Sequence, residues 1–278
     1  MLIIADSGSS KTDWLFINGE NTYNIQSPGI NPFFQNMDEI IGNQKDLIND
    51  EFKAAASKLF FYGAGCIKGK TDKTVLDALS QIFPNAQIQV EDDMLGAARA
   101  LLGNTKGIAC ILGTGANSCF YNGTKIMDKI PTLGFILGDE GSGAHIGKLF
   151  LNDYFKRAIP KDLKAKIDME LQLEMAGVLN SVYREEYPSR YLASFSTFLN
   201  KNINHTYTQN LIKKCFAEFF IRNIERYENY KNLQVNFVGS IAYHYSDLLK
   251  EVAFERGITV GKIICKPIEG LKRFHTNF

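Results

Sequence analysis

The chain lacks an excess of charge of either sign, since its formal net charge at neutral pH is +1 over 278 residues. Proteins that hold nucleic acid or an anionic membrane by electrostatic attraction carry a strongly basic surface. The composition therefore supports neither kind of partner, and we expect no nucleic acid and no membrane among the binding partners.

The chain also lacks cysteine pairs at the spacing of metal sites, and it lacks long apolar runs. The five cysteines are scattered, with no Cys-x-x-Cys pair and no histidine at zinc-ligand spacing, which predicts reduced and mostly buried thiols. The first apolar run ends at Asp6 and follows no basic segment, so it predicts neither a signal peptide nor a membrane span. These absences predict a soluble, cytoplasmic protein.

No linker rich in Pro, Gly or Ser divides the chain, so the domain organisation is read from a repeat of elements. The first half predicts strands at 2–5, 13–17, 23–26, 58–62 and 88–90, and helices at 37–52, 72–83 and 94–102. The second half predicts strands at 107–112, 118–121, 125–128, 235–238 and 259–264, and helices from 142, at 240–256 and at 268–274. Helical stretches at 162–186 and 206–230 interrupt it. This order predicts two α/β lobes, 1–105 and 106–278, with a helical insertion at about 160–230.

A glycine-containing turn between two strands occurs once in each half. The first is Gly8-Ser9-Ser10-Lys11-Thr12 and the second is Gly113-Thr114-Gly115. Glycine allows close approach to the backbone, so the N–H groups of such a turn can surround an anion. One such turn is more often an ordinary hairpin. A matching turn in each half favours a pair that clamps the phosphates of a nucleotide.

Acidic residues follow strands or precede helices in three places. Asp6 is expected to hold Mg²⁺ through water, because Mg²⁺ keeps most of its waters and takes few carboxylates, but it could also cap the turn. Asp93, or else Asp92, could be a general base at the start of a helix, although Asp is also common as a helix N-cap. Asp139-Glu140 precedes another helix, where capping is again the alternative.

Two familiar phosphate motifs are excluded by their spacing. The segment from Gly63 to Thr71 ends like a P-loop, but its glycines are separated by three or five residues where four are required. A dinucleotide fingerprint beginning at Gly113 would need glycine at position 118, where Ser118 stands. An oxidoreductase is therefore disfavoured.

Five segments in this order resemble the BadF/BadG/BcrA/BcrD ATPase family, and specifically its N-acetylglucosamine kinase-like members, within the actin-like ATPase superfamily. The segments are Asp6–Thr12, Asp92–Ala97, Gly113–Asn117, Leu137–Gly143 and Val238–Ser240. The resemblance spans essentially the whole chain. It implies two actin-like, ribonuclease H-like lobes with a nucleotide in the cleft between them.

The resemblance further implies an ATP- and Mg²⁺-dependent kinase that phosphorylates the 6-hydroxyl of N-acetylglucosamine. The spacing of Asp93 and Gly96 matches the catalytic Asp-x-x-Gly of sugar kinases, so Asp93 is the expected general base. The phosphate contacts are expected from Gly8, Ser9, Ser10, Lys11, Thr12, Gly113, Thr114 and Gly115, with Asp6 at the metal.

The same resemblance assigns the sugar contacts to Asn31, Asn117, Asp139 and Glu140. Amide side chains suit hydroxyl groups because they both donate and accept hydrogen bonds. Gly239-Ser240, where a strand enters a helix, is expected on the adenine side, although many actin-like ATPases have paired glycines there.

Two other functions stay open within the same family. An ATPase activator of 2-hydroxyacyl-CoA dehydratases or benzoyl-CoA reductases would need cysteines for an iron–sulfur cluster, and no cysteine lies in 138–147. A sugar-binding regulator would be expected to have lost the base, yet Asp93 is present. Aromatic residues at helical spacing in the insertion, Phe216, Phe219, Phe220 and Tyr227, predict core, or else the interface of a homodimer.

Overall fold

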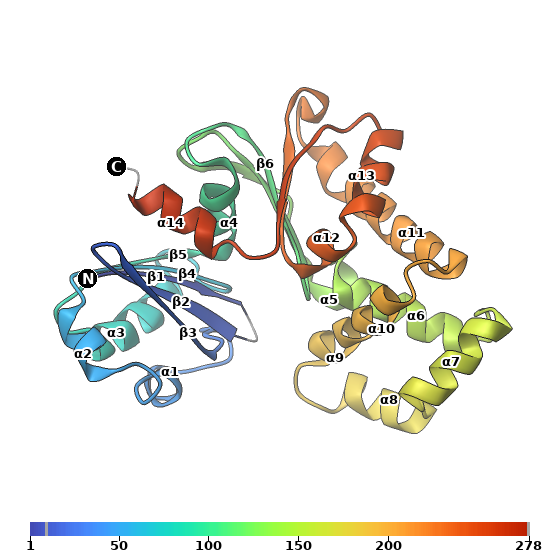
Figure 1. Ribbon diagram of the computed structural model, residues 1–278, viewed down its shortest axis with the longest axis horizontal. Coiled ribbons are helices and arrows are strands. Elements are labelled where there is room, and N and C mark those ends of the chain that lie inside the picture. The colour runs from blue at the N-terminus through green and yellow to red at the C-terminus, as the bar shows by residue number, and fades with distance from the viewer. Residues whose placement is uncertain (9–10, 277–278) are drawn as a thin grey trace. The chain divides into compact units, whose positions relative to one another are not determined.

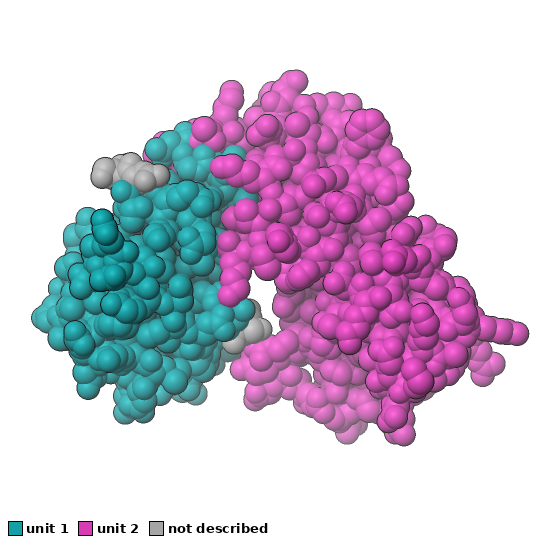
Figure 2. All heavy atoms as spheres, in the orientation of Figure 1, with its two compact units in different colours: residues 1–104, 267–278 teal, residues 105–266 magenta. Residues whose placement is uncertain are grey.

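The computed structural model of the chain describes residues 1–8 and 11–276 and divides into two compact units (Figure 2). Unit 1 comprises residues 1–104 and 267–278, and unit 2 comprises residues 105–266. Each unit is built on one five-stranded mixed sheet. None of the described helices combines the length and the apolar character needed to cross a membrane.

The sheet of unit 1 has the strand order β3-β2-β1-β4-β5 (Figure 1). Its strands are β1 (Leu2–Ser7), β2 (Lys11–Asn18), β3 (Asn21–Pro28), β4 (Lys58–Gly63) and β5 (Gln87–Asp92). The first three form antiparallel pairs, whereas β1, β4 and β5 run parallel. Three strands therefore end at the same edge of the sheet, and Asp6 and Asp92 stand at that edge.

Helices cover both faces of this sheet. On one face lie α1 (Met37–Gln44), α2 (Asp50–Ala55) and α3 (Asp72–Ile82), and on the other α4 (Asp93–Leu102) and α14 (Ile268–Thr276) (Figure 1). Trp14, Phe61 and Phe83 are fully buried in the core. The single helix predicted over 37–52 is two helices, because Asn49 caps α2 and has a non-helical backbone.

The C-terminal helix α14 belongs to unit 1, whereas the sequence-based division placed it in the second lobe. It packs closely on α4, since a Cβ at Gly270 would stand 2.5 Å from the carbonyl oxygen of Ala100. Tyr62 adds a polar contact, with its hydroxyl 2.7 Å from Nε2 of His275. Unit 2 is thus a continuous segment inserted between two parts of unit 1.

The sheet of unit 2 repeats the plan of unit 1, with the order β10-β9-β6-β7-β8. Its strands are β6 (Gly107–Leu112), β7 (Ala116–Tyr121), β8 (Ile126–Lys129), β9 (Val235–Val238) and β10 (Val260–Ile264). Read from β8, the sheet has two antiparallel pairs followed by two parallel ones, as in unit 1. The predicted pair of actin-like α/β lobes is confirmed.

The helices of unit 2 form most of its mass. They are α5 (Gly134–Leu137), α6 (Gly143–Phe155), α7 (Lys161–Leu171), α8 (Met175–Tyr183), α9 (Pro188–Ser194), α10 (Ser196–Lys201), α11 (Thr206–Arg222), η1 (Ile224–Arg226), η2 (Tyr230–Asn232), α12 (Ser240–His244) and α13 (Ser246–Glu255). The helix predicted over 162–186 is broken, because Gln172 adopts φ 46° and ends α7. The short helices α5, α9 and α10 were not predicted.

The aromatic stripe of the insertion is core. Phe216, Phe219 and Phe220 of α11 are fully buried, and the latter two pack against Phe237 of β9 and on one another. Tyr227 is also buried, and its hydroxyl lies 2.8 Å from that of Ser118. The core interpretation is therefore confirmed for these four residues, and they offer no dimer surface.

Candidate active site

The second glycine turn, Gly113–Gly115, is fastened to the N-terminus of α6. The N–H of Gly143 donates to the carbonyl of Gly113 at 2.8 Å, and the N–H of Ala144 donates to that of Thr114 at 3.1 Å. The N–H of Gly113 closes the turn on the carbonyl of Gly115. The described residues provide no acceptor for the N–H groups of Thr114 and Gly115, which suit an anion.

There is also room for an anion at this turn. A Cβ placed at Gly113 would meet no described atom within 4 Å. The prediction that Gly113 presents its own N–H to a phosphate is not met, because that group is used inside the turn. Of the three turn residues, Thr114 and Gly115 are therefore the ones whose N–H groups suit an anion.

Asp139 lies directly against this turn. Its Oδ1 accepts from the N–H of Ala116 at 3.2 Å, and its Oδ2 is 3.1 Å from the position of a Cβ on Gly115. Burial raises the pKa of the Asp139 carboxyl; the hydrogen bond from Ala116 opposes that rise, and the negative charge of Glu140 adds to it. The backbone of Asp139 has φ 55°, a left-handed conformation that residues other than glycine rarely adopt.

Glu140 and Asn117 flank the same place. The Oε1 of Glu140 is 3.5 Å from Nε of Arg222 on α11. Asn117 is the second residue of β7, and its Oδ1 accepts from the N–H of Ser118 at 2.9 Å. The cap of α6 is Ser142, so the capping alternative for Asp139 and Glu140 does not apply.

Gly239 packs against Leu112 and Gly113, where the turn begins. A Cβ there would stand 2.2 Å from the carbonyl oxygen of Leu112, and φ is 125°, so only glycine fits. Ser240 follows as the exposed first residue of α12. Unit 2 thus brings together the predicted phosphate turn, three predicted sugar contacts and the predicted adenine side.

In unit 1 the first glycine turn lies at the end of β1. The N–H of Gly8 donates to the carbonyl of Lys11 at 3.0 Å, so this group too closes its own turn instead of facing a phosphate. Lys11 is exposed, whereas the predicted phosphate contacts Ser9 and Ser10 lie outside the described residues.

Thr12 differs from its predicted role. It is fully buried, and its hydroxyl lies 2.8 Å from that of Ser7 and 3.2 Å from the carbonyl of Pro28. A phosphate contact would need an exposed hydroxyl. In this structure Thr12 ties the hairpin to β3, because it faces into the fold on a strand where successive side chains alternate.

Asp6 has an acidic neighbour that the sequence did not single out. The register of β1 and β2 places Asp13 directly opposite Asp6. Like charges directly across a strand pair are destabilising, so a cation at this edge would offset the repulsion. The described residues hold no group of three or more His, Cys, Asp or Glu that could bind a metal. The carboxylate chemistry fits Mg²⁺, which retains most of its waters.

Asp92 and Asp93 take different roles. The side chain of Asp92 caps α4 by accepting from the N–H of Leu95 at 2.7 Å, whereas Asp93 is the first helical residue. Gly96 allows α4 to approach β4, since a Cβ there would lie 2.8 Å from the ring of Tyr62. The capping alternative therefore holds for Asp92, and the Asp-x-x-Gly spacing has a packing cause.

Asn31 shapes the segment before α1. Its Oδ1 accepts from the N–H of Phe33 at 3.0 Å, and its N–H donates to the Gln35 side chain at 2.9 Å. A Cβ on Gly65 would lie 2.6 Å from Asn31 Oδ1. The predicted sugar contact is therefore a turn residue here.

The thiols are poorly suited to a metal cluster. Cys66, Cys110, Cys119 and Cys215 are buried, and Cys265 is partly exposed. Burial, followed by the charges of Asp93, Asp72 and Asp92, raises the pKa of the Cys66 thiol to about 12. Iron–sulfur ligation requires thiolates.

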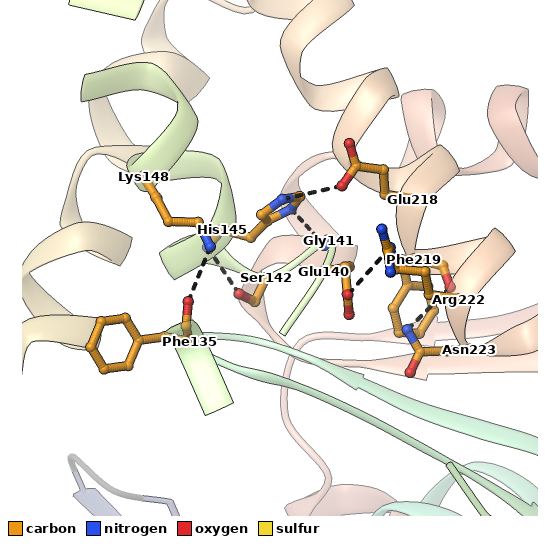
Figure 3. A network of polar contacts seen from close by, with 10 residues as sticks. All are labelled: Phe135, Glu140, Gly141, Ser142, His145, Lys148, Glu218, Phe219, Arg222 and Asn223. Carbon is orange, nitrogen blue, oxygen red and sulfur yellow. Dashed lines mark hydrogen bonds and ion pairs between the residues drawn. The ribbon is translucent and has the colours of Figure 1, made fainter. Parts of the chain in front are cut away.

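Sequence reasoning missed three residues near the Asp139–Glu140 segment. His145 and Arg222 contact Gly141 and Glu140 (Figure 3), and the charge of Lys148 acts on Asp139. Lys148 donates to the carbonyl of Phe135 at 3.1 Å. His145 was set aside because no second histidine has a paired spacing with it. His145 is buried, which the sequence alone could not show.

Comparisons with known proteins bear on the whole chain. No protein-family model and no curated protein matches it. A solved structure from Porphyromonas gingivalis, named "Putative N-acetylglucosamine Kinase", has 40% identity and a TM-score of 0.95, covering 100% of this chain and 99% of that one.

More distant structures share the fold alone. A protein of the same name from Chromobacterium violaceum has 14% identity and a TM-score of 0.72, with 98% of each chain covered. MreB5 of Spiroplasma citri bound to AMPPNP has 10% identity and a TM-score of 0.58, covering 99% of this chain and 96% of that one. The high identity over full length to the first structure and the five shared motifs decide the matter: the chain belongs to the BadF/BadG/BcrA/BcrD ATPase family, among its N-acetylglucosamine kinase-like members.

Proposed function

We propose that the protein is an ATP-dependent amino-sugar kinase that transfers the γ-phosphoryl group to the 6-hydroxyl of N-acetylglucosamine. One observation carries the proposal: the Asp139 carboxylate lies against the Gly113–Gly115 turn, whose Thr114 and Gly115 N–H groups suit an anion. Groups for a phosphate and for a hydroxyl therefore share one place. Phosphoryl transfer depends mainly on positioning and on neutralising charge.

Unit 1 supplies the reactive acids in this proposal. Asp93, in the first turn of α4, accepts the proton of the sugar hydroxyl as general base. Asp6 would hold Mg²⁺ through water, and Mg²⁺ there would supply neutralisation of the negative charge on the phosphate oxygens. Lys11, which is exposed, contacts the phosphates from this unit.

Unit 2 supplies recognition. Asp139 and Glu140, with Asn117, bind sugar hydroxyls. Gly239 and Ser240 contact the adenine side of the nucleotide, next to the turn that Gly239 packs on. The similarity to the Porphyromonas gingivalis protein supports an amino sugar over other acceptors.

The purified protein, Mg-ATP and a panel of sugars provide the test. ADP release is measured without sugar and then with N-acetylglucosamine, glucosamine, N-acetylmuramic acid or glucose. Any phosphorylated sugar is identified by its mass. We expect release that depends on N-acetylglucosamine. Its 6-deoxy analogue, which lacks the accepting hydroxyl, is the matched control and should give no product. Release indifferent to sugar would instead favour an activator or regulator.

A further inference from the structure

A buried histidine connects two elements of unit 2 beside the proposed sugar site. His145 lies in the first turn of α6, and its side chain is 7% exposed. Its Nδ1 accepts from the N–H of Gly141 at 3.2 Å, and its Nε2 lies 3.4 Å from Oε2 of Glu218 on α11 (Figure 3). A buried polar ring with partners on both nitrogens is fixed in place.

The contacts define the proton positions on the ring. A nitrogen that accepts from an N–H carries no proton, so the proton of the neutral ring is on Nε2, toward Glu218. Burial chiefly lowers the pKa of His145 to about 4; the positive charges of Lys148, Lys214 and Arg222 add to this, and Glu140 opposes it. At neutral pH Nδ1 therefore remains an acceptor.

Gly141 depends on that acceptor. Its φ is 75°, and a Cβ on it would lie 2.8 Å from Cβ of Phe219, so the segment passes close to α11. A buried N–H left without a partner is costly. The N–H of Ser142 meanwhile donates to the carbonyl of Asp139 at 3.1 Å. The Asp139–Ser142 segment is thus held by a bond of its own and by the first turn of α6.

A second residue on the same face of α11 also contacts the Asp139–Ser142 segment. Arg222 stands four residues after Glu218, one helical turn along, and pairs with Glu140. Glu218 therefore orients the ring that holds Gly141, while Arg222 holds the carboxylate one residue earlier. This arrangement therefore holds Glu140 through Arg222, whereas Asp139 is held through the hydrogen bond from the N–H of Ser142.

We propose that His145, oriented by Glu218, is a positioning residue for the sugar: it holds the Gly141 N–H and so fixes the Asp139 and Glu140 carboxylates for substrate hydroxyls. This inference rests on the proposed kinase function. It assigns His145 no contact with substrate and no proton transfer. Its loss should weaken sugar binding and leave nucleotide binding unchanged.

The test compares His145→Leu with His145→Asn, whose amide oxygen can replace Nδ1 as the acceptor. We expect His145→Leu to raise the KM for the sugar about tenfold with the KM for ATP unchanged. The sugar KM of His145→Asn should lie close to that of the wild type. Equal values for the two variants, or a parallel change in both KM values, would overturn the proposal.

A second pair of variants removes the dependence on a buried substitution. Glu218→Ala leaves the ring in place but takes away its partner, and should raise the KM for the sugar severalfold. Glu251→Ala is the matched control, since it removes the ion pair that α11 makes through Lys213 elsewhere. A sugar KM unchanged in Glu218→Ala would contradict the role given to Glu218.

Hydrogen exchange separates this inference from the kinase proposal. The Gly141 amide should exchange slowly in the wild type and fast in His145→Leu, whether or not any sugar is phosphorylated. A protein that shows this difference but has no sugar-dependent activity would refute the kinase. An amide equally protected in both proteins would refute the positioning role of His145.

Discussion

The two units share one strand order but support their glycine turns differently. In unit 1 the Gly8 N–H closes the turn on the Lys11 carbonyl, within the hairpin itself. In unit 2 the turn is closed by Gly113 and is also bound through two carbonyls to the N-terminus of α6. A repeated sheet therefore does not bring a repeated site: each unit completes its turn with different elements.

The ends of the strands differ in the same way. β1 ends with Asp6-Ser7 where β6 ends with Ile111-Leu112, and β5 runs into Asp93 where β10 is followed by Cys265. Of these positions, acidic residues stand only at those in unit 1. The comparison agrees with the division of roles that we propose, in which unit 1 provides the catalytic acids and unit 2 provides the segment that recognises the sugar.

The largest effect is expected from Asp93→Asn, which removes the proposed base from unit 1. We expect kcat to fall by about 10²–10⁴-fold with ATP affinity nearly unchanged, because general bases contribute on that scale. Steady-state ADP release and equilibrium nucleotide binding measure the two quantities. Asp50→Asn, also at the first position of a helix in unit 1, is the matched control and should keep full kcat. Near-normal activity of Asp93→Asn would show that Asp93 is not the general base and would contradict the catalytic role proposed for unit 1.

Gly239→Ala should disturb the Gly113–Gly115 turn of unit 2, because Gly239 packs against its first residue. The added Cβ would strike the carbonyl of Leu112 and would sit at φ 125°, a strain of about 1–3 kcal/mol. We expect a lower free energy of unfolding and an ATP KM raised about tenfold, with denaturant unfolding and kinetics as the measurements. Gly257→Ala has φ 66° but meets nothing within 4 Å, so it should lose stability without losing ATP affinity. Equal ATP affinities would show that Gly239 does not shape the turn.

Asp139→Asn tests recognition by unit 2 directly. We expect the KM for the sugar to rise about tenfold while the KM for ATP is maintained, because a charged acceptor becomes a neutral one. The same substitution at exposed Asp128 should change neither constant. A fall in kcat alone would place Asp139 in the chemistry and blur the distinction between the units.

The smallest effect concerns the pH dependence of stability. The pKa of Asp139 is raised in the fold, so its charged form is disfavoured there and the wild type loses stability as pH rises through the raised value. The neutral amide introduced by Asp139→Asn does not titrate and has no such loss. The unfolding free energy of this variant, relative to the wild type, should therefore increase between about pH 4 and pH 7.5 in urea titrations. A decrease would mean that the carboxylate is stabilised by its surroundings.

The fold and the grouping of motifs in unit 2 were predictable because they depend on local patterns. Strands, turns and the Asp-x-x-Gly spacing are short-range features, and the repeat of elements indicated two similar sheets. Helix ends were predicted less well, since Asn49 and Gln172 stop helices by capping and by a left-handed backbone.

What remained hidden depends on distant contacts. Whether the Thr12 hydroxyl faces out or into the sheet is decided by β3, and the buried His145 needs Gly141 and Glu218 to be recognised as more than a core residue. Equally, the place of α14 depends on Gly270 meeting Ala100, far apart in the chain. Such pairings leave no periodic mark in the sequence.

The position of α14 has a consequence for synthesis on the ribosome. Unit 2 is one continuous segment and can fold as soon as it emerges, because domains generally fold as units during translation. Unit 1 must wait for residues 268–276 to pack against α4, the helix that begins with Asp93. The packing of α4 is therefore completed only after residues 268–276 have left the ribosome.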